Sequence, residues 1–234
     1  MPEPLVLIPG LTCTAELYAP QWRTLAVGRM VMVADHRSDD TLDGIVTRLL
    51  ADAPPRFAVC GLSMGGTLAF ELMRRAPERV TRLALLDTTA KPATPERNAA
   101  RLELINLAGN GQYDRAIDLL WPTFVAPGRL EDHALRVIVQ RMATETGPEA
   151  FIRQQQALLN RPDSRPGLAE IRTPTLVLVG SEDRLTPVAD SEEIAAGIPG
   201  AKLTIIPGCG HLATLEAPDS VTSALAQWLA DESP

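Results

Sequence analysis

The chain has 234 residues, of which 45% are hydrophobic and 22% charged, enough length and apolar content to bury one sizeable core. Its 22 basic and 29 acidic side chains give a formal net charge of -7, which argues against a nucleic acid as the main partner. No apolar run approaches the ~18 residues of a membrane span, and the first residues lack the basic start and apolar stretch of a signal peptide. We therefore expect a cytoplasmic protein without a membrane span.

Six short, nearly continuous apolar runs predict buried strands of the kind found in parallel sheets that helices cover on both faces. In chain order, these runs lie at residues 5–8, 30–34, 57–60, 83–86, 175–179 and 203–206. Segments of helical periodicity separate them, at residues 15–25, 42–51, 65–75, 190–196 and 218–229. This alternation predicts an α/β fold with a mostly parallel, doubly wound sheet of about six strands.

The connection from Asp87, at the end of the fourth predicted strand, to Thr175 is far longer than a crossover needs. It contains helical periodicity at residues 96–107, 113–119, 130–143 and 149–159. We interpret residues 91–170 as a helical cap inserted into a core formed by residues 1–90 and 171–234. Its aromatic side chains either line a pocket, with Trp121 and Phe124 as candidate substrate-binding residues, or form a small core of their own. Its exposed apolar face is compatible with a lid or with a homodimer contact.

The strongest chemical signal is Gly61-Leu62-Ser63-Met64-Gly65, which matches G-x-S-x-G between a predicted strand and a predicted helix. A serine at such a tight turn sits in strained backbone and projects its hydroxyl above the sheet. Side chains at positions 61 and 65 would collide there, so both positions favour glycine. We predict that Ser63 is a nucleophile, against the alternative that it only caps the helix.

A serine nucleophile needs a base, and the chain has three histidines. His36 and His133 lie among charged residues and are expected at the surface, whereas His211 lies in a glycine-rich loop after the last predicted strand. The base in turn needs an acidic partner. Asp183, just past a strand end, is the favoured acid; its neighbour Glu182 is a weaker candidate.

Asp87 is the more serious rival of Asp183, because it also ends a strand at the same edge of the sheet. Both Asp183 and Asp87 remain candidates for the acidic partner of the histidine, and Asp183 is preferred.

The order Ser63, Asp183, His211, with each residue after a strand, resembles the α/β-hydrolase superfamily of serine-nucleophile, cap-containing, esterase-like enzymes. The resemblance covers nearly the whole chain and includes the elbow (residues 61–65), the late aspartate, the Gly-x-Gly-His loop and the position of the insertion. It implies Ser63, Asp183 and His211 as the catalytic triad. It also implies an oxyanion hole formed by the backbone N–H groups of Leu11 and Met64.

Two segments depart from the usual pattern of that superfamily. The loop after the first strand (residues 9–12) carries Pro9 before Gly10 where the superfamily usually has His-Gly. Proline at position 9 removes an amide, but not the proposed donor at Leu11, so the hole can survive. Charged residues at 36–40 replace a glycine-rich turn and are expected to alter one wall of the pocket.

These features predict a serine hydrolase that cleaves an ester of a small to medium, fairly apolar acyl substrate through an acyl-enzyme, with no cofactor and no metal. Amide or lactone hydrolysis, C–C bond hydrolysis and a non-hydrolytic elimination could use the same residues. The last two would favour an arginine near the serine that binds a substrate carboxylate. A ligand-binding receptor on the same fold, with negligible turnover, is the alternative from another class.

The three cysteines and two of the insertion's arginines are candidates for separate roles. Cys13, Cys60 and Cys209 are too few and too scattered for a disulfide framework or a zinc site, and we expect small buried hydrophobic side chains. Their closeness to the loops could make the site sensitive to thiol reagents. Arg141 and Arg153 of the insertion could bind a substrate carboxylate, although a solvated helix face is favoured.

Overall fold

The computed structural model describes residues 2–231 and confirms the six predicted strands. They form one sheet in which every neighbouring pair is parallel. Across the sheet the order is β2 (Val31–Val33), β1 (Leu5–Ile8), β3 (Phe57–Leu62), β4 (Val80–Leu86), β5 (Thr175–Gly180) and β6 (Lys202–Ile206). Because all the strands are parallel, the loops that follow them meet at one edge of the sheet.

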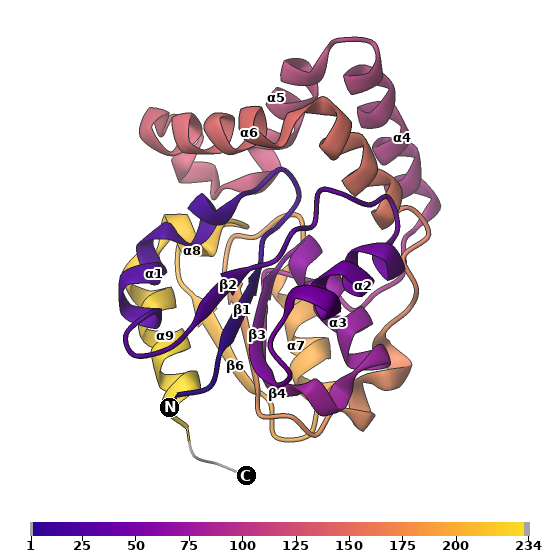
Figure 1. Cartoon of the computed structure of the whole chain (residues 1–234). Helices are drawn as coiled ribbons and strands as arrows, with labels where there is room; N and C mark the ends of the chain where they lie inside the picture. Colours follow the sequence, from indigo (N-terminus) through magenta and orange to yellow (C-terminus); the bar gives the residue numbers. More distant parts are fainter. Residues whose placement is uncertain (1, 232–234) are drawn as a thin grey trace.

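Helices cover both faces of the sheet (Figure 1). One face packs against a 3₁₀ turn (Ala15–Tyr18), α1 (Ala19–Leu25), α8 (Ala213–Glu216) and α9 (Pro218–Ala230). The other face packs against α2 (Leu42–Asp52), α3 (Met64–Arg75) and α7 (Val188–Gly197). The short helix α8 was not predicted from the sequence.

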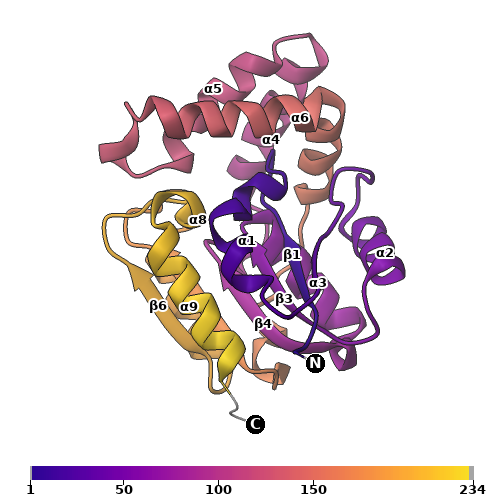
Figure 2. The same ribbon diagram turned by 60° about the vertical axis from the view of Figure 1, so that its left-hand side comes forward.

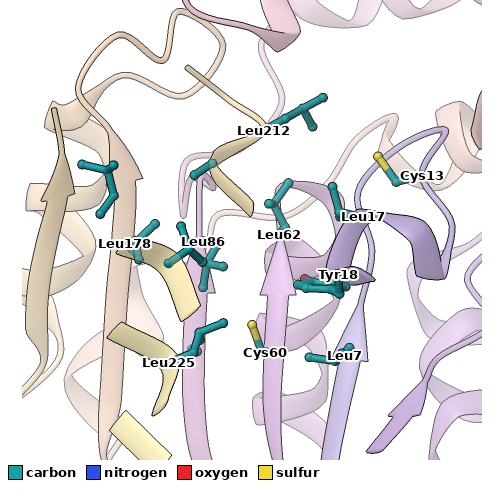
Figure 3. Close-up of a cluster of buried hydrophobic side chains, with 14 of the residues drawn as sticks. Leu7, Cys13, Leu17, Tyr18, Cys60, Leu62, Leu86, Leu178, Leu212 and Leu225 are labelled. Carbon is teal, nitrogen blue, oxygen red and sulfur yellow. The ribbon is translucent and has the colours of Figure 1, made fainter. Parts of the chain in front are cut away.

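Side-chain alternation along the strands divides the core into two layers. In β1, Leu5 and Leu7 belong to the α1/α9 side and Val6 and Ile8 to the other. Figure 3 shows the α1/α9 side, where Leu7, Cys60, Leu86 and Leu178 come from four neighbouring strands and Leu225 from α9. The edge strand β6 differs from the expectation of burial on both faces, since much of it is exposed. An edge strand has a neighbour on one side only.

The insertion lies above the edge at which the strands end, as Figures 1 and 2 show. It consists of α4 (Pro95–Gly109), α5 (Tyr113–Phe124), a 3₁₀ turn (Pro127–Arg129) and α6 (His133–Leu158). Helix α6 contains the last two predicted helices, which meet at a kink where Gly147, with φ 75° and ψ 163°, is not helical. Helix α5 extends beyond the predicted residues 113–119 and includes Pro122, which cannot donate the usual helical hydrogen bond but lies only two residues before the helix ends.

A small core holds α4, α5 and α6 together, with Ala116, Ile117, Ala143 and Phe151 at its centre. A last 3₁₀ turn (Arg165–Glu170) leads back to the sheet, and its Leu168 packs in the layer that also contains Ile194. The exact limits of the insertion at 91 and 170 stay a prediction. Within residues 2–231, no helix combines the length and apolar character that crossing a membrane requires.

Candidate active site

The turn between β3 and α3 holds Ser63 in an unusual backbone conformation. Its φ of 56° and ψ of -110° lie in a region that residues with a side chain rarely adopt. The two flanking glycines permit this turn through close backbone approach. A Cβ atom on Gly61 would overlap the carbonyl of Gly65, and one on Gly65 would overlap the carbonyl of Ile8. The turn that presents the serine hydroxyl therefore requires glycine at both flanking positions.

A chain of hydrogen bonds runs from this serine to His211 and on to Asp183. His211 Nε2 is 2.8 Å from Ser63 Oγ, and His211 Nδ1 is 2.7 Å from Asp183 Oδ2. Because an ionised carboxylate only accepts, Nδ1 carries the proton and Nε2 is left to accept from the serine hydroxyl. The ring is 2% exposed, so water competes little for either bond.

The loop after β5 keeps Asp183 ionised. Its Oδ1 accepts from the backbone N–H groups of Leu185 and Thr186 at 2.8 and 2.9 Å, and its Oδ2 accepts from Thr186 Oγ1 at 2.7 Å. Burial by itself raises the pKa of Asp183, but the charge and hydrogen bond of His211 and the donors of Thr186 outweigh it and hold that pKa below its usual value. A negative charge is thereby fixed beside the imidazole.

Asp87, the rival acid, has a different environment at the end of β4. It is fully buried, and its Oδ1 accepts from Gly180 N at 2.9 Å. In the described part of the chain its Oδ2 has no hydrogen-bond partner. Burial, and then the charge of Asp183, raise the pKa of Asp87 well above its usual value. The geometry thus connects Asp183 to the histidine and leaves Asp87 as a buried acid behind it.

The loop at residues 9–12 lies next to the serine, as the oxyanion prediction requires, because Gly10, Leu11 and Ser63 line the same cavity. Met64 is the first residue of α3, so its N–H is one of the helix-start donors that lack an intrahelical acceptor. The loop itself is tied down beyond Leu11. Thr12 N donates to Gln154 Oε1 of α6 at 3.1 Å, and Thr146 Oγ1 donates to Thr12 O at 3.2 Å.

His36 was expected at the surface, and this prediction is wrong. The ring is 2% exposed, and its Nε2 lies 3.0 Å from the carbonyl oxygen of Gly10, to which it donates. Burial lowers the pKa of His36 to about 4, so the ring is neutral near pH 7. The charged neighbours hid this in the sequence, because Asp35 is exposed and Arg37 half-exposed, whereas the histidine turns inward to the loop at residues 9–12. His133 is exposed as expected.

A cavity of about 140 Å³ opens above Ser63 and His211, between the strand-end loops and the insertion. Most of its wall is apolar and includes Leu62, Leu104, Leu120, Phe124, Leu158 and Leu185. The Phe124 ring stacks near His211, with 6.4 Å between ring centroids and 15° between planes. Trp121 is buried elsewhere: it packs in the core layer on the α1/α9 side and donates its indole N–H to Leu130 O at 3.1 Å.

Residues 5–224 match the family model described as Alpha/beta hydrolase family. The chain belongs to the α/β hydrolase family. It is 31% identical over 192 residues to a pimeloyl-[acyl-carrier protein] methyl ester esterase of Aromatoleum aromaticum, covering 76% of each chain. It is 27% identical to the 3-oxoadipate enol-lactonase 2 of Acinetobacter baylyi, covering 82% of this chain and 71% of that one.

Among solved structures, a thermophilic esterase from Thermogutta terrifontis, determined with malate bound, superposes with a TM-score of 0.90. The two are 27% identical, and the match covers 97% of this chain and 89% of the esterase. The likeness therefore extends over the core and the insertion together.

Two arginines of this α/β hydrolase were missed in the sequence. Arg97 and Arg101 of α4 line the cavity together with Leu104, and Gln155 of α6 joins them. The spacing 97, 101, 104 places all three on one helix face and was the available signal. The arginines that were considered lie elsewhere: Arg141 pairs with Glu16, and Arg153 Nε donates to Arg37 O at 2.8 Å.

The three cysteines of this α/β hydrolase are free and buried. Burial raises the pKa of the Cys13 and Cys60 thiols to about 12 and that of Cys209 further still. Cys13 lines the cavity, but a thiol with so high a pKa does not form a thiolate near pH 7. Among the described residues, no three His, Cys, Asp or Glu side chains are grouped to hold a metal ion.

Proposed function

We propose that this α/β hydrolase cleaves carboxylic esters through an acyl-enzyme on Ser63. The observation that carries the proposal is the unbroken chain of hydrogen bonds from Ser63 through His211 to Asp183, at 2.8 and 2.7 Å, on the wall of an apolar cavity. A serine that is bonded to a buried histidine, which is bonded in turn to a buried aspartate, is the arrangement that activates a hydroxyl for acyl transfer. The 31% identity to a methyl ester esterase supports the same reaction class.

The first half of the reaction forms the acyl-enzyme. His211 Nε2 takes the proton of Ser63 as Oγ attacks the ester carbonyl, and Asp183 stabilises the imidazolium that results. The carbonyl oxygen becomes an oxyanion, which the N–H groups of Leu11 and Met64 bind. Each such donor in comparable enzymes contributes roughly 3 kcal/mol to the transition state. Collapse breaks the bond to the leaving alkoxide, which receives the proton from His211.

The second half repeats these steps with water. His211 removes a proton from water, the hydroxide attacks the acyl carbonyl, and Ser63 leaves with the proton returned to its Oγ. Every step uses side chains and amides of this chain, and no cofactor or metal enters. His36 acts indirectly, since its N–H holds the Gly10 carbonyl and thereby orients the peptide that ends in the Leu11 amide.

The cavity favours a small substrate with a fairly apolar acyl part. Its volume of about 140 Å³ is close to that of the engineered protein cavity of about 150 Å³ that accepts benzene. Phe124 stands over the histidine and is proposed to contact the substrate; Trp121, behind the wall, supports it.

C–C bond hydrolysis is a second candidate, because Arg97 and Arg101 line the cavity and such a reaction would use a carboxylate-bearing substrate. It would need the same serine and histidine. Ester cleavage is preferred because the relatives named above with stated activities include two esterases.

The deciding experiment is intact mass spectrometry after incubation with a fluorophosphonate, followed by an assay with a short-chain nitrophenyl ester. We expect one adduct and multiple turnovers, and neither in the Ser63→Ala variant. A retained adduct in that variant would show that Ser63 is not the nucleophile. An adduct on Ser63 without ester turnover would instead favour C–C hydrolysis, an elimination or a receptor role.

A further inference from the structure

Two positive charges and one amide form a polar corner in the otherwise apolar cavity. Arg97 and Arg101 come from one face of α4, and Gln155 comes from the second half of α6. The same cavity contains Ser63 and His211, so a molecule held at this corner also faces the proposed nucleophile. The two guanidinium groups of this corner offer hydrogen-bond donors only, because guanidinium groups cannot accept.

These charges lack a counter-ion in the part of the chain that the structure describes. Among the ion pairs of residues 2–231, none involves Arg97 or Arg101. The nearby Lys91, by contrast, pairs with Asp190 at 2.6 Å. Arg97 Nη2 donates only to a backbone carbonyl, that of Leu185, at 2.9 Å. Both side chains are half-buried, and a charge that is partly removed from water without a counter-ion is costly, so the pair favours an anion in the cavity.

Gln155 adds an independent observation. Its side chain is fully buried, and its Oε1 accepts from Arg101 Nη1 at 2.6 Å. This bond fixes the amide so that Nε2 is the free end, and Nε2 has no acceptor in the described part of the chain. Buried amide donors are nearly always paired, so the cavity lacks an acceptor at this position.

Like-charge repulsion points the same way. Burial, followed by the positive charges of Arg161 and Arg97, lowers the pKa of Arg101 to about 9. The group still carries its charge near pH 7, and an anion would relieve both the repulsion and the loss of solvation.

We propose that Arg97, Arg101 and Gln155 bind a free carboxylate of the substrate, so that the substrate is a half-ester of a short dicarboxylic acid. This inference rests on the proposed ester hydrolysis and names its substrate class. One planar carboxylate can accept from the Arg101 guanidinium and from Gln155 Nε2 with its two oxygens, while Arg97 balances the remaining charge. The small cavity limits the chain between the two carboxyl groups to a few carbons.

The test compares two methyl esters of similar shape: monomethyl glutarate, which carries a carboxylate, and methyl 5-methylhexanoate, in which an isopropyl group replaces it. We expect the wild-type enzyme to have at least about tenfold higher kcat/KM for the half-ester. Arg101→Gln should lower kcat/KM for the half-ester by about 10- to 100-fold, as expected for the loss of a charge-assisted hydrogen bond. It should leave the neutral ester within about threefold, and Arg101→Lys should restore part of the preference.

Arg115→Gln is the matched control, because Arg115 is an exposed arginine of α5 outside the cavity lining. This substitution should leave kcat/KM unchanged for both esters. Equal kcat/KM values for both esters in the wild-type enzyme would overturn the carboxylate site. An equal fall for both esters in Arg101→Gln would mean that Arg101 only supports the fold.

A second readout does not depend on ester turnover. Glutarate should slow the labelling of Ser63 by a fluorophosphonate, and Arg101→Gln should remove this protection. If no ester is turned over but glutarate still protects, the proposed reaction fails and the carboxylate site stands. If esters are turned over and glutarate does not protect, the proposed reaction stands and the carboxylate site fails. Better protection by inorganic phosphate than by glutarate would show that the site prefers a phosphate group to a carboxylate, and would overturn the inference.

Discussion

The strand-end loops and the inserted helices meet the same cavity with opposite hydrogen-bonding states. In the loops, both oxygens of Asp183 and both nitrogens of His211 have partners before any substrate is present. In the helices, Arg97 and Arg101 lack a counter-ion within residues 2–231, and Gln155 Nε2 lacks an acceptor there. Under the proposed function, the reacting groups are thus held in place before substrate binds, whereas the groups proposed to recognise the substrate keep unused hydrogen-bonding capacity.

The loops contain a second contrast, between two carboxylates at neighbouring strand ends. Asp183 accepts from several donors and has a lowered pKa, while Asp87 accepts from Gly180 and has a raised one. The raised pKa of Asp87 comes first from burial and then from the charge of Asp183. Only an ionised carboxylate can stabilise an imidazolium. Substituting Asp183 and substituting Asp87 should therefore have very different effects on activity.

The largest expected effect is therefore that of Asp183→Asn. By analogy with other triads it should lower kcat by about 10⁴-fold, because asparagine would favour the wrong histidine tautomer. Asp87→Asn should keep kcat within about threefold of wild type. Steady-state kinetics with a nitrophenyl ester measure both, and circular dichroism checks that both variants fold. A greater loss in folded Asp87→Asn would assign the acid to Asp87.

Asp87→Asn should also change how stability depends on pH. A carboxyl whose folded pKa is raised binds its proton more tightly in the folded state, so wild-type stability falls as pH rises above the unfolded value near 3.8. The variant lacks this pH-dependent loss of stability. The free energy of unfolding of Asp87→Asn minus that of wild type, measured by urea unfolding, should therefore be larger at pH 8 than at pH 5.

His36 offers the next test, because its buried ring bonds to Gly10 of the loop at residues 9–12. Its pKa falls from 6.5 to about 4 through burial, so the unfolded chain binds more protons than the folded one between these values. Stability should therefore fall as pH drops from 6.5 to 4, by up to about 3 kcal/mol from this group. In His36→Gln that part of the slope should vanish, whereas in His133→Gln, at an exposed position, the slope should match wild type. Equal slopes in all three proteins would contradict a buried neutral His36.

Most of the fold was predictable because its signals are local. Continuous apolar runs mark the parallel strands, and the glycines at 61 and 65 mark a turn that tolerates no Cβ. The aspartate and histidine after strand ends were found for the same reason, since parallel topology brings those ends together. What failed depends on how distant elements pack. Nothing near His36 shows that it lies under Gly10, and helical period alone does not say which face of α4 turns toward the serine.

The smallest expected effect concerns the junction of the two regions, where Glu216 of α8 bonds to both. Its Oε2 accepts from Ala126 N of the insertion at 2.9 Å, and its Oε1 accepts from Leu212 N, next to His211, at 3.3 Å. Glu216→Ala would leave the buried Ala126 N–H without an acceptor, so the free energy of unfolding should fall by about 1–3 kcal/mol. Glu216→Gln keeps one acceptor oxygen and should lose less than about 1 kcal/mol.

The control for this junction is Glu182→Ala, because Glu182 is exposed on the adjacent loop. Denaturant unfolding should find that control within about 0.5 kcal/mol of wild type. Leu212 N, next to His211, also donates to Phe124 O at 3.0 Å, so one hydrogen bond to the insertion remains in Glu216→Ala. We therefore expect kcat to fall only about two- to tenfold. A loss as large as that of Asp183→Asn would mean that the insertion, and not the sheet edge alone, holds His211 in reach of Ser63.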